Sequence, residues 1–356
     1  MTKGFYTLHH KTFIYALRVQ FYADGRERFS ERRKMSPILP SSSSFWRGDR
    51  RKRLGTSGVV PFAGRLGANQ EFAVDNDSDS QKELLEKIPD AAPYIPVRDA
   101  LSFRPLLQPD LWKAATVEAI GSCLLVYLTN FVAVGLAPLV EVFDSGPLVP
   151  ALVGAGTAFV SLPLFIFAIG PVSGGHINPL ITIATFFGRL ATLPRAILYV
   201  TFQTFGAAVG GWLLRASFDT RDFRVPGCFY DTSLITTRSA FTIEFTTDFA
   251  LIFFCFAVGL DPRQRAVFGP ALGPILCGLA VAMCTFFTGI TIPGYSGFSG
   301  NPGRCFGAMV GSHFESYHWI HWIGPLVAAI VHGVLYQLIP PQVPVRRDQP
   351  SGSGSD

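Results

Sequence analysis

Two Asn-Pro pairs carry the most specific chemistry in this sequence. They lie in the related stretches SGGHINPLITIATFFG, residues 173–188, and SGFSGNPGRCFGAMVG, residues 296–311. Asparagine is a favoured N-cap, and proline is tolerated at the first helical position because its missing N–H has no intrahelical partner there. The pairs therefore predict two short helices, at residues 179–187 and 302–310.

Glycine-rich stretches precede both pairs and can turn backbone carbonyl groups toward a common space, because glycine allows such backbone shapes without a side-chain clash. We expect a ladder of carbonyl acceptors with the side-chain amides of Asn178 and Asn301 at its centre. The N-terminal ends of both short helices would add positive partial charge there and repel cations. The predicted carbonyl positions are Gly174, Gly175, His176, Gly297 and Ser299.

Long apolar stretches must hold these short helices in place. The chain has 356 residues, of which 49% are hydrophobic and 15% charged, as is usual for a protein that crosses a membrane several times. Six stretches approach the roughly 20 residues that a helix needs to cross the hydrocarbon core. They cover residues 111–136, 149–170, 194–214, 241–260, 268–290 and 319–339. A soluble protein with this pattern would consist of buried helices with no amphipathic helices to surround them. The sequence therefore predicts a polytopic membrane protein.

The two Asn-Pro stretches occupy equivalent places in two halves of the chain, about 111–214 and 241–339. Each half has three spans, so the second half must enter the membrane from the opposite side, and the repeat is inverted. The first span of each half carries a carboxylate, Glu118 or Glu244. A carboxylate inside a span needs partners, and we expect it to accept hydrogen bonds from the backbone of the nonhelical segments. A proton relay is the alternative.

The two ends of the chain differ from this membrane body. Residues 1–110 are rich in charge and serine, which predicts a largely disordered cytoplasmic tail, and residues 340–356 predict a flexible cytoplasmic end. Arginine-rich loops place both ends in the cytoplasm, although residues 215–238 also carry several arginines. The cysteines suggest neither a metal site nor a disulfide, since Cys228 is alone in its loop and Cys305 follows Arg304.

Several motifs in order resemble the major intrinsic proteins, the family of the aquaporins and aquaglyceroporins. They are EAIGS at residues 118–122, SGGHINP, QTFGAAVGG at residues 203–211, Glu244, SGFSGNPGRCFG and WIGPLVAAI at residues 322–330. The resemblance implies an all-α membrane protein with six transmembrane helices and two re-entrant half-helices in an inverted repeat, the aquaporin-like fold. It also implies a passive pore in each protomer of a homotetramer.

The resemblance also assigns a selectivity filter to four positions. Arg304 matches the arginine of the family's outer constriction, and Phe298 is the loop position beside it. Gly289 takes a position where water-selective members have histidine and glycerol-conducting members have glycine. The second-span position is Ala158, or Phe159 if the register slips by one residue. Small and apolar residues beside one arginine favour glycerol-like solutes over strict selectivity for water.

Two residues depart from the family's repeated Asn-Pro-Ala signature, because Leu180 follows the first pair and Gly303 the second. We hypothesise that Leu180 fills the space that Gly303 vacates. Cys305 replaces the acidic residue that glycerol-conducting members often have after the arginine.

The sequence thus favours a passive channel for glycerol, water or similar uncharged solutes that excludes protons and ions, in the plasma membrane or an intracellular one. The alternatives are a channel for hydrogen peroxide or ammonia, and a non-conducting membrane scaffold closed by Leu180. An enzyme is not expected, because only the separated Glu118, Glu244 and Asp248 lie within the spans. We expect no cofactor, no metal and no nucleic-acid partner.

Overall fold

The computed structural model describes residues 62–66, 79–143, 146–262 and 265–339. The serine- and arginine-rich stretch at residues 41–53 and the C-terminal residues 340–356, for which the sequence predicts disorder, lie outside these ranges.

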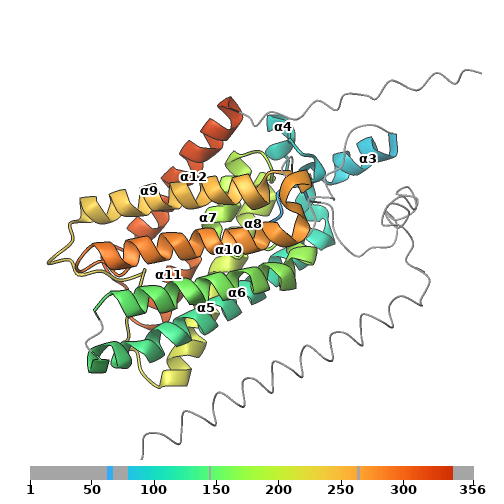
Figure 1. Ribbon diagram of the computed structural model, residues 1–356. Helices are drawn as coiled ribbons and strands as arrows, with labels where there is room; N and C mark the ends of the chain where they lie inside the picture. The colour runs from blue at the N-terminus through green and yellow to red at the C-terminus, as the bar shows by residue number, and fades with distance from the viewer. Residues whose placement is uncertain (1–61, 67–78, 144–145, 263–264, 340–356) are drawn as a thin grey trace, which may run out of the picture. The chain divides into compact units, whose positions relative to one another are not determined.

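Six long helices form the body of the described chain and confirm the predicted spans (Figure 1). Each is long and apolar enough to cross a membrane, by length and composition. The helices are α5 Pro109–Phe143, α6 Leu148–Ser173, α8 Leu193–Phe218, α9 Thr237–Cys255, α10 Arg265–Thr291 and α12 Ile320–Leu338. The last turn of the fourth span is a π-helical segment, η5 Phe256–Leu260.

Two short helices lie between the long ones, α7 Pro179–Phe187 and α11 Pro302–Gly311. With a rise of about 1.5 Å per residue, each covers only about half of a bilayer core. Helix α7 of the first half packs against α12 of the second, and α11 of the second half packs against α8 of the first. Each half therefore supplies part of the packing surface of the other.

Glycine residues allow α8 to approach its neighbours closely. A Cβ atom on Gly206 would lie 2.0 Å from the carbonyl oxygen of Ala119 in α5. A Cβ atom on Gly211 would lie 1.9 Å from the carbonyl oxygen of Gly307 in α11. Since neither distance is possible for a real side chain, these glycines set the helix spacing around the half-helices.

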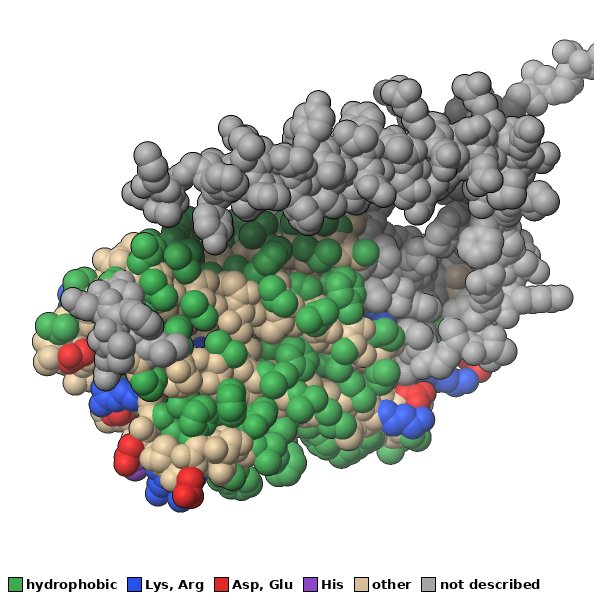
Figure 2. All heavy atoms as spheres, turned by 60° about the horizontal axis from the view of Figure 1, so that its bottom comes forward, with side chains coloured by type: hydrophobic (Ala, Val, Ile, Leu, Met, Phe, Trp, Pro, Cys, Tyr) green, Lys and Arg blue, Asp and Glu red, His purple; other side chains and the backbone are tan. Residues whose placement is uncertain are grey.

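Apolar side chains cover the middle of the face shown in Figure 2, and charged side chains gather at its two ends. Large apolar side chains on several helices remain exposed, including Leu164 of α6 at 62% and Phe205 of α8 at 65%. Such a belt is expected where lipid replaces water as the surrounding solvent.

Residues before the first span also fold onto this body, within the region 1–110 for which the sequence predicts a largely disordered tail. They form α3 Asp79–Lys87, η3 Pro89–Ala91, α4 Val97–Ala100 and η4 Arg104–Leu107. The carboxylate of Asp90 is buried and pairs with the guanidinium of Arg195 in α8 at 2.6 Å. The segment is too polar to form a core of its own, and it uses the surface of the channel body instead.

Candidate functional site

Both Asn-Pro pairs begin a half-helix through the same side-chain cap. The side-chain oxygen of Asn178 accepts a hydrogen bond from the backbone N–H of Leu180 at 2.9 Å. The side-chain oxygen of Asn301 accepts one from the backbone N–H of Arg304 at 3.1 Å. Proline follows at the first helical position in both cases. This is the arrangement expected for an N-cap, and it directs the amide nitrogens away from their own helices.

The amide nitrogens connect the two halves of the chain. Asn178 Nδ2 donates a hydrogen bond to the carbonyl oxygen of Gly300 at 2.6 Å, and Asn301 Nδ2 donates one to that of Ile177 at 2.9 Å. The N-termini of α7 and α11 therefore meet. An asparagine amide has two N–H groups, and these contacts use one on each side.

Glu118 supports the segment before α7. Its carboxylate accepts hydrogen bonds from the backbone N–H groups of His176 at 3.0 Å and Ile177 at 2.5 Å. The hydroxyl of Ser173 and the side-chain amide of Gln203 donate to the same carboxylate at 2.6 and 2.8 Å. Four donors thus satisfy a fully buried acid, and they hold a nonhelical backbone in one shape.

Glu244 does the same for the segment before α11. It accepts hydrogen bonds from the backbone N–H and the hydroxyl of Ser299, at 3.0 and 2.6 Å, and from the hydroxyl of Tyr295 at 2.8 Å. The imidazole of His321 in α12 lies 3.4 Å away. The two carboxylates therefore occupy equivalent positions in the two halves, each beside an irregular stretch of backbone.

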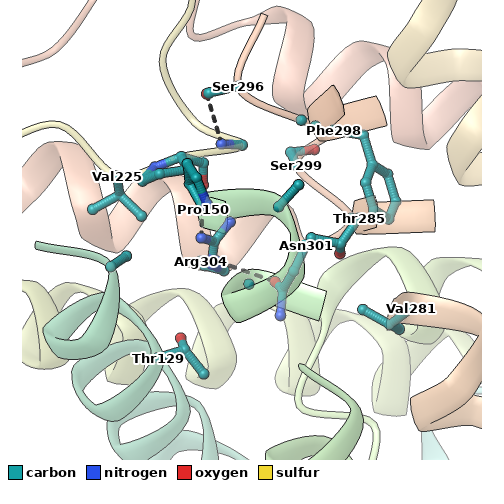
Figure 3. Close-up of a pocket in the computed structure, with 18 of the residues that line it drawn as sticks. Thr129, Pro150, Val225, Val281, Thr285, Ser296, Phe298, Ser299, Asn301 and Arg304 are labelled. Carbon is teal, nitrogen blue, oxygen red and sulfur yellow. Dashed lines mark hydrogen bonds between the residues drawn. The ribbon is translucent and has the colours of Figure 1, made fainter. Parts of the chain in front are cut away.

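A cavity of about 860 Å³ passes between the two halves beside both asparagines. One end lies among residues 224–231 and 290–296, and the other lies at Leu66, Leu251, Cys255 and Cys277. With the orientation that the sequence predicts, the first is the outer end and the second the inner end. Of the predicted carbonyl positions, His176, Gly297 and Ser299 line this cavity. Figure 3 shows Asn301, Ser299 and Phe298 on its wall, with Thr129 of α5 and Val281 of α10 also facing it.

Arg304 lies toward the outer end of the cavity, one helical turn after the cap (Figure 3). Its Nη2 donates a hydrogen bond to the carbonyl oxygen of Pro226 at 2.8 Å. A Cβ atom added to Gly227 would lie 3.1 Å from Arg304 Nη1. The loop at residues 226–227 therefore positions the guanidinium against the cavity, where it can donate hydrogen bonds to hydroxyl groups.

Gly289, Phe298 and Ala151 of α6 also line the cavity. A Cβ atom on Gly289 would lie 3.2 Å from the Cβ of Ala151. Within the described part of α6, the lining residues are Pro150, Ala151, Gly154 and Leu162, and Ala158 is not one of them. The α6 residue that packs against Gly289 is thus Ala151, two turns from the predicted Ala158, while Phe159 is exposed.

Two cysteines beside Arg304 correct a sequence-based interpretation. Cys228 and Cys305 form a disulfide, although the sequence suggested no external pair. The bond joins the loop that contacts Arg304 to the residue after Arg304. Two cysteines separated by 77 positions give no spacing pattern, and the pairing depends on how the loop folds over α11.

Gly174 and Gly175 are buried at the inner end, outside the lining of the cavity in the described chain. The carbonyl oxygen of Gly174 accepts a hydrogen bond from the backbone N–H of Leu66 at 2.9 Å. The carbonyl group of Gly174, which the sequence predicts to be an acceptor on the pore wall, therefore binds Leu66 instead. Sequence reasoning missed Leu66, since nothing in a polar N-terminal region points to a docked residue.

The neighbours of Gly303 bear on the predicted compensation by Leu180. A Cβ atom on Gly303 would lie 3.3 Å from Pro179 Cδ, so the nearest residue across the centre is Pro179. Leu180 is fully buried in a cluster with Ile166, Leu251 and Ile252. The three atoms nearest to that Cβ position belong to Asn301 and Pro179 and not to Leu180, so the hypothesis that Leu180 fills the space vacated by Gly303 stays a prediction.

Comparisons with known proteins agree with this geometry. A family model described as major intrinsic protein matches residues 106–336. Aquaporin TIP1-1 of Arabidopsis thaliana is 30% identical over 248 residues, which cover 68% of this chain and 94% of that protein. Aquaporin-4 of Rattus norvegicus is 28% identical over 241 residues, covering 67% of this chain and 71% of that protein. The solved structure of the aquaglyceroporin from Plasmodium falciparum matches with a TM-score of 0.50 and 18% identity, over 64% of this chain and 96% of that one.

Proposed function

This chain belongs to the major intrinsic protein family, and from that premise we propose that it conducts glycerol and water passively and excludes protons and ions. It is a multi-pass membrane protein of a family of small-solute channels. The proposal concerns the choice of solute, the exclusion of ions, a homotetrameric assembly and residence in the plasma membrane.

The residues of the proposed filter support glycerol as the solute. Gly289 and Ala151 add almost no side-chain bulk to the cavity that Arg304 lines, and Phe298 adds an apolar surface. A polyol presents hydroxyl groups on one side and carbon–hydrogen groups on the other. The guanidinium and the carbonyl groups can bind the hydroxyls while the apolar wall contacts the carbon chain.

The centre of the cavity supports the exclusion of cations. Two helix N-termini meet there, and the side-chain amides of Asn178 and Asn301 add hydrogen-bond donors. Arg304 adds a full positive charge nearer the outer end. A cation would lose part of its hydration shell at this depth and would face the positive partial charge of two helix N-termini.

Stopped-flow light scattering on proteoliposomes containing the full-length chain tests the proposal. We expect glycerol and water to equilibrate faster than in protein-free liposomes, while an internal pH dye reports no added proton flux. Water flux without glycerol flux would contradict the choice of solute, and the same vesicles would then be tested with hydrogen peroxide and ammonia. No flux of any solute, either in this chain or in the Phe62→Ala, Leu66→Ala variant described below, would favour a scaffold, although Leu180 is buried in the core and does not line the cavity of the described chain.

A further inference from the structure

The segment Phe62–Leu66 is buried at the inner end of the cavity, far from the first span in sequence. All five residues are buried, and Ala63 and Arg65 are completely inaccessible. The guanidinium of Arg195 lies over the ring of Phe62, with its Cζ atom 4.1 Å from the ring centroid. The imidazole of His176 lies beside the same ring. The channel body therefore provides a site that buries this segment.

Hydrogen bonds attach this segment to the irregular backbone before α7. Arg65 Nη1 donates to the carbonyl oxygen of Gly170 at 3.2 Å, and Leu66 donates its backbone N–H to that of Gly174 at 2.9 Å. The carbonyl oxygen of Gly64 lies 2.7 Å from Nε2 of His176. Burial lowers the pKa of Arg65 to about 10, so its charge persists at neutral pH.

Leu66 reaches from that backbone to the opposite wall of the cavity. Its Cδ2 would lie 3.2 Å from a Cβ atom on Gly259 in η5, and Cys277 Sγ of α10 lies 2.8 Å from the same point. Leu66 also belongs to one apolar cluster with Leu251, Cys255 and Leu260. The side chain of Leu66 thus lies beside η5 and lines the same end of the cavity as Leu251 and Cys255 of α9 and Cys277 of α10, while its backbone is bonded to the α6–α7 segment.

We propose that the inner mouth of the pore is a binding site for a short peptide segment, and that the chain's own Phe62–Leu66 occupies it and closes the pore. The inference rests on the proposed function, since closure has meaning only for a conducting cavity. Arg65 binds carbonyl groups that end α6, Phe62 packs on Arg195, and Leu66 closes the apolar end of the cavity. Conduction requires this segment to leave its site.

Release of the segment does not require the channel to unfold. Only Phe62 and Leu66 contribute large apolar side chains, and the hydrogen bonds to Gly170, Gly174 and His176 can be replaced by water at an open mouth. The half-helices keep their own support from Glu118 and Glu244, which contact other residues. Bound and released states can therefore exchange within one folded body.

The test compares water permeability of the natural full-length chain and a Phe62→Ala, Leu66→Ala variant in proteoliposomes. Truncating two buried apolar side chains should favour the released state and raise the permeability about tenfold. Leu107→Ala serves as the control, because Leu107 is 83% exposed and precedes the same span. Equal permeability in the natural chain and the double variant would overturn the proposal, provided that the labelling described next is also unchanged.

Labelling of Cys277 gives a second measurement that does not depend on conduction. A maleimide attached to a large polymer cannot pass the filter, so it reaches Cys277 only through the inner mouth. In detergent-solubilised full-length protein, peptide mass spectrometry should show about tenfold faster labelling in the double variant. Faster labelling without flux in either protein would support the binding site and contradict the proposed conduction instead. Unchanged labelling together with unchanged flux would leave no role for the segment.

Discussion

The side-chain amide of Asn301 donates a hydrogen bond to the backbone carbonyl of Ile177 across 2.9 Å. The same side chain caps α11 through its oxygen, which accepts from the backbone N–H of Arg304. One residue therefore starts a half-helix and attaches it to the other half of the repeat. The two functions use different atoms, so a substitution can separate them.

Asn301→Asp should keep the cap and lose the connection between the halves. An aspartate oxygen still accepts from Arg304, but no N–H remains to satisfy the carbonyl of Ile177. We expect a loss of about 1–3 kcal/mol in stability, because a buried acceptor is left without its donor. The carboxylate would also weaken the barrier to cations at the centre of the pore.

Thermal unfolding in detergent and proton flux in dye-loaded proteoliposomes check this prediction. Asn178→Asp is the matched variant, since it removes the equivalent bond to Gly300 and should behave alike. Full retention of both melting temperature and proton exclusion in the two variants would show that the amide donors are dispensable.

The disulfide between Cys228 and Cys305 should position the filter as well as stabilise the fold. Replacing both residues by serine frees the loop that holds Pro226 against Arg304. We expect a loss of about 2–4 kcal/mol in stability. Solutes larger than glycerol, such as erythritol, should permeate faster, because the guanidinium would no longer be held at one side of the cavity.

The measurement pairs thermal unfolding with light scattering for glycerol and erythritol. Cys123→Ser is the control, because Cys123 is a half-buried free cysteine of α5. If the double serine variant keeps the natural ratio of erythritol to glycerol permeability, the disulfide has no part in selectivity.

The half-helices could be predicted closely from sequence because their signals are local. An Asn-Pro pair indicates where a helix begins, and the predicted short helix at residues 179–187 agrees with α7. The carboxylates in the first spans were equally informative, since a charge in an apolar helix must have partners. Both inferences depend on chemistry within a few residues.

Features that depend on the tertiary arrangement could not be predicted in the same way. Along α6, small residues at Ala151, Gly154 and Ala158 repeat at helical spacing, so the sequence indicates a face without indicating the depth of each residue. The pairing of Cys228 with Cys305 requires a loop path that no local pattern specifies. The docking of residues 62–66 depends on a site that other segments create.

Gly303→Ala and Leu180→Ala should have very different effects on stability. A Cβ atom at residue 303 would lie 3.3 Å from Pro179 Cδ, a contact that a small shift can relieve. Leu180 is completely buried, and its truncation should cost about 2–5 kcal/mol. Thermal unfolding of both variants and of the double variant checks this. A double variant that is more stable than Leu180→Ala alone would support the hypothesis of compensation between the two positions.

Arg304→Ala should widen the proposed filter and remove the guanidinium that donates a hydrogen bond to the carbonyl oxygen of Pro226. Without this side chain, Gly289 and Ala151 face an open cavity. We expect erythritol permeability to rise about tenfold relative to glycerol, since one positioned donor contributes on the order of 1–2 kcal/mol to discrimination. Cation leakage should rise as well, because a fixed positive charge is lost.

Arg221→Ala is the matched control for this prediction, since Arg221 donates to the carbonyl of Ser312 at 3.0 Å and does not line the cavity of the described chain. Both variants lose one arginine at the same end of the molecule, so a general effect of net charge would appear in both. Light scattering with the two polyols and a cation-sensitive dye separates the outcomes. A change confined to Arg304→Ala would assign selectivity to the position of the guanidinium, whereas equal changes in the two variants would assign it to the charge of the outer surface.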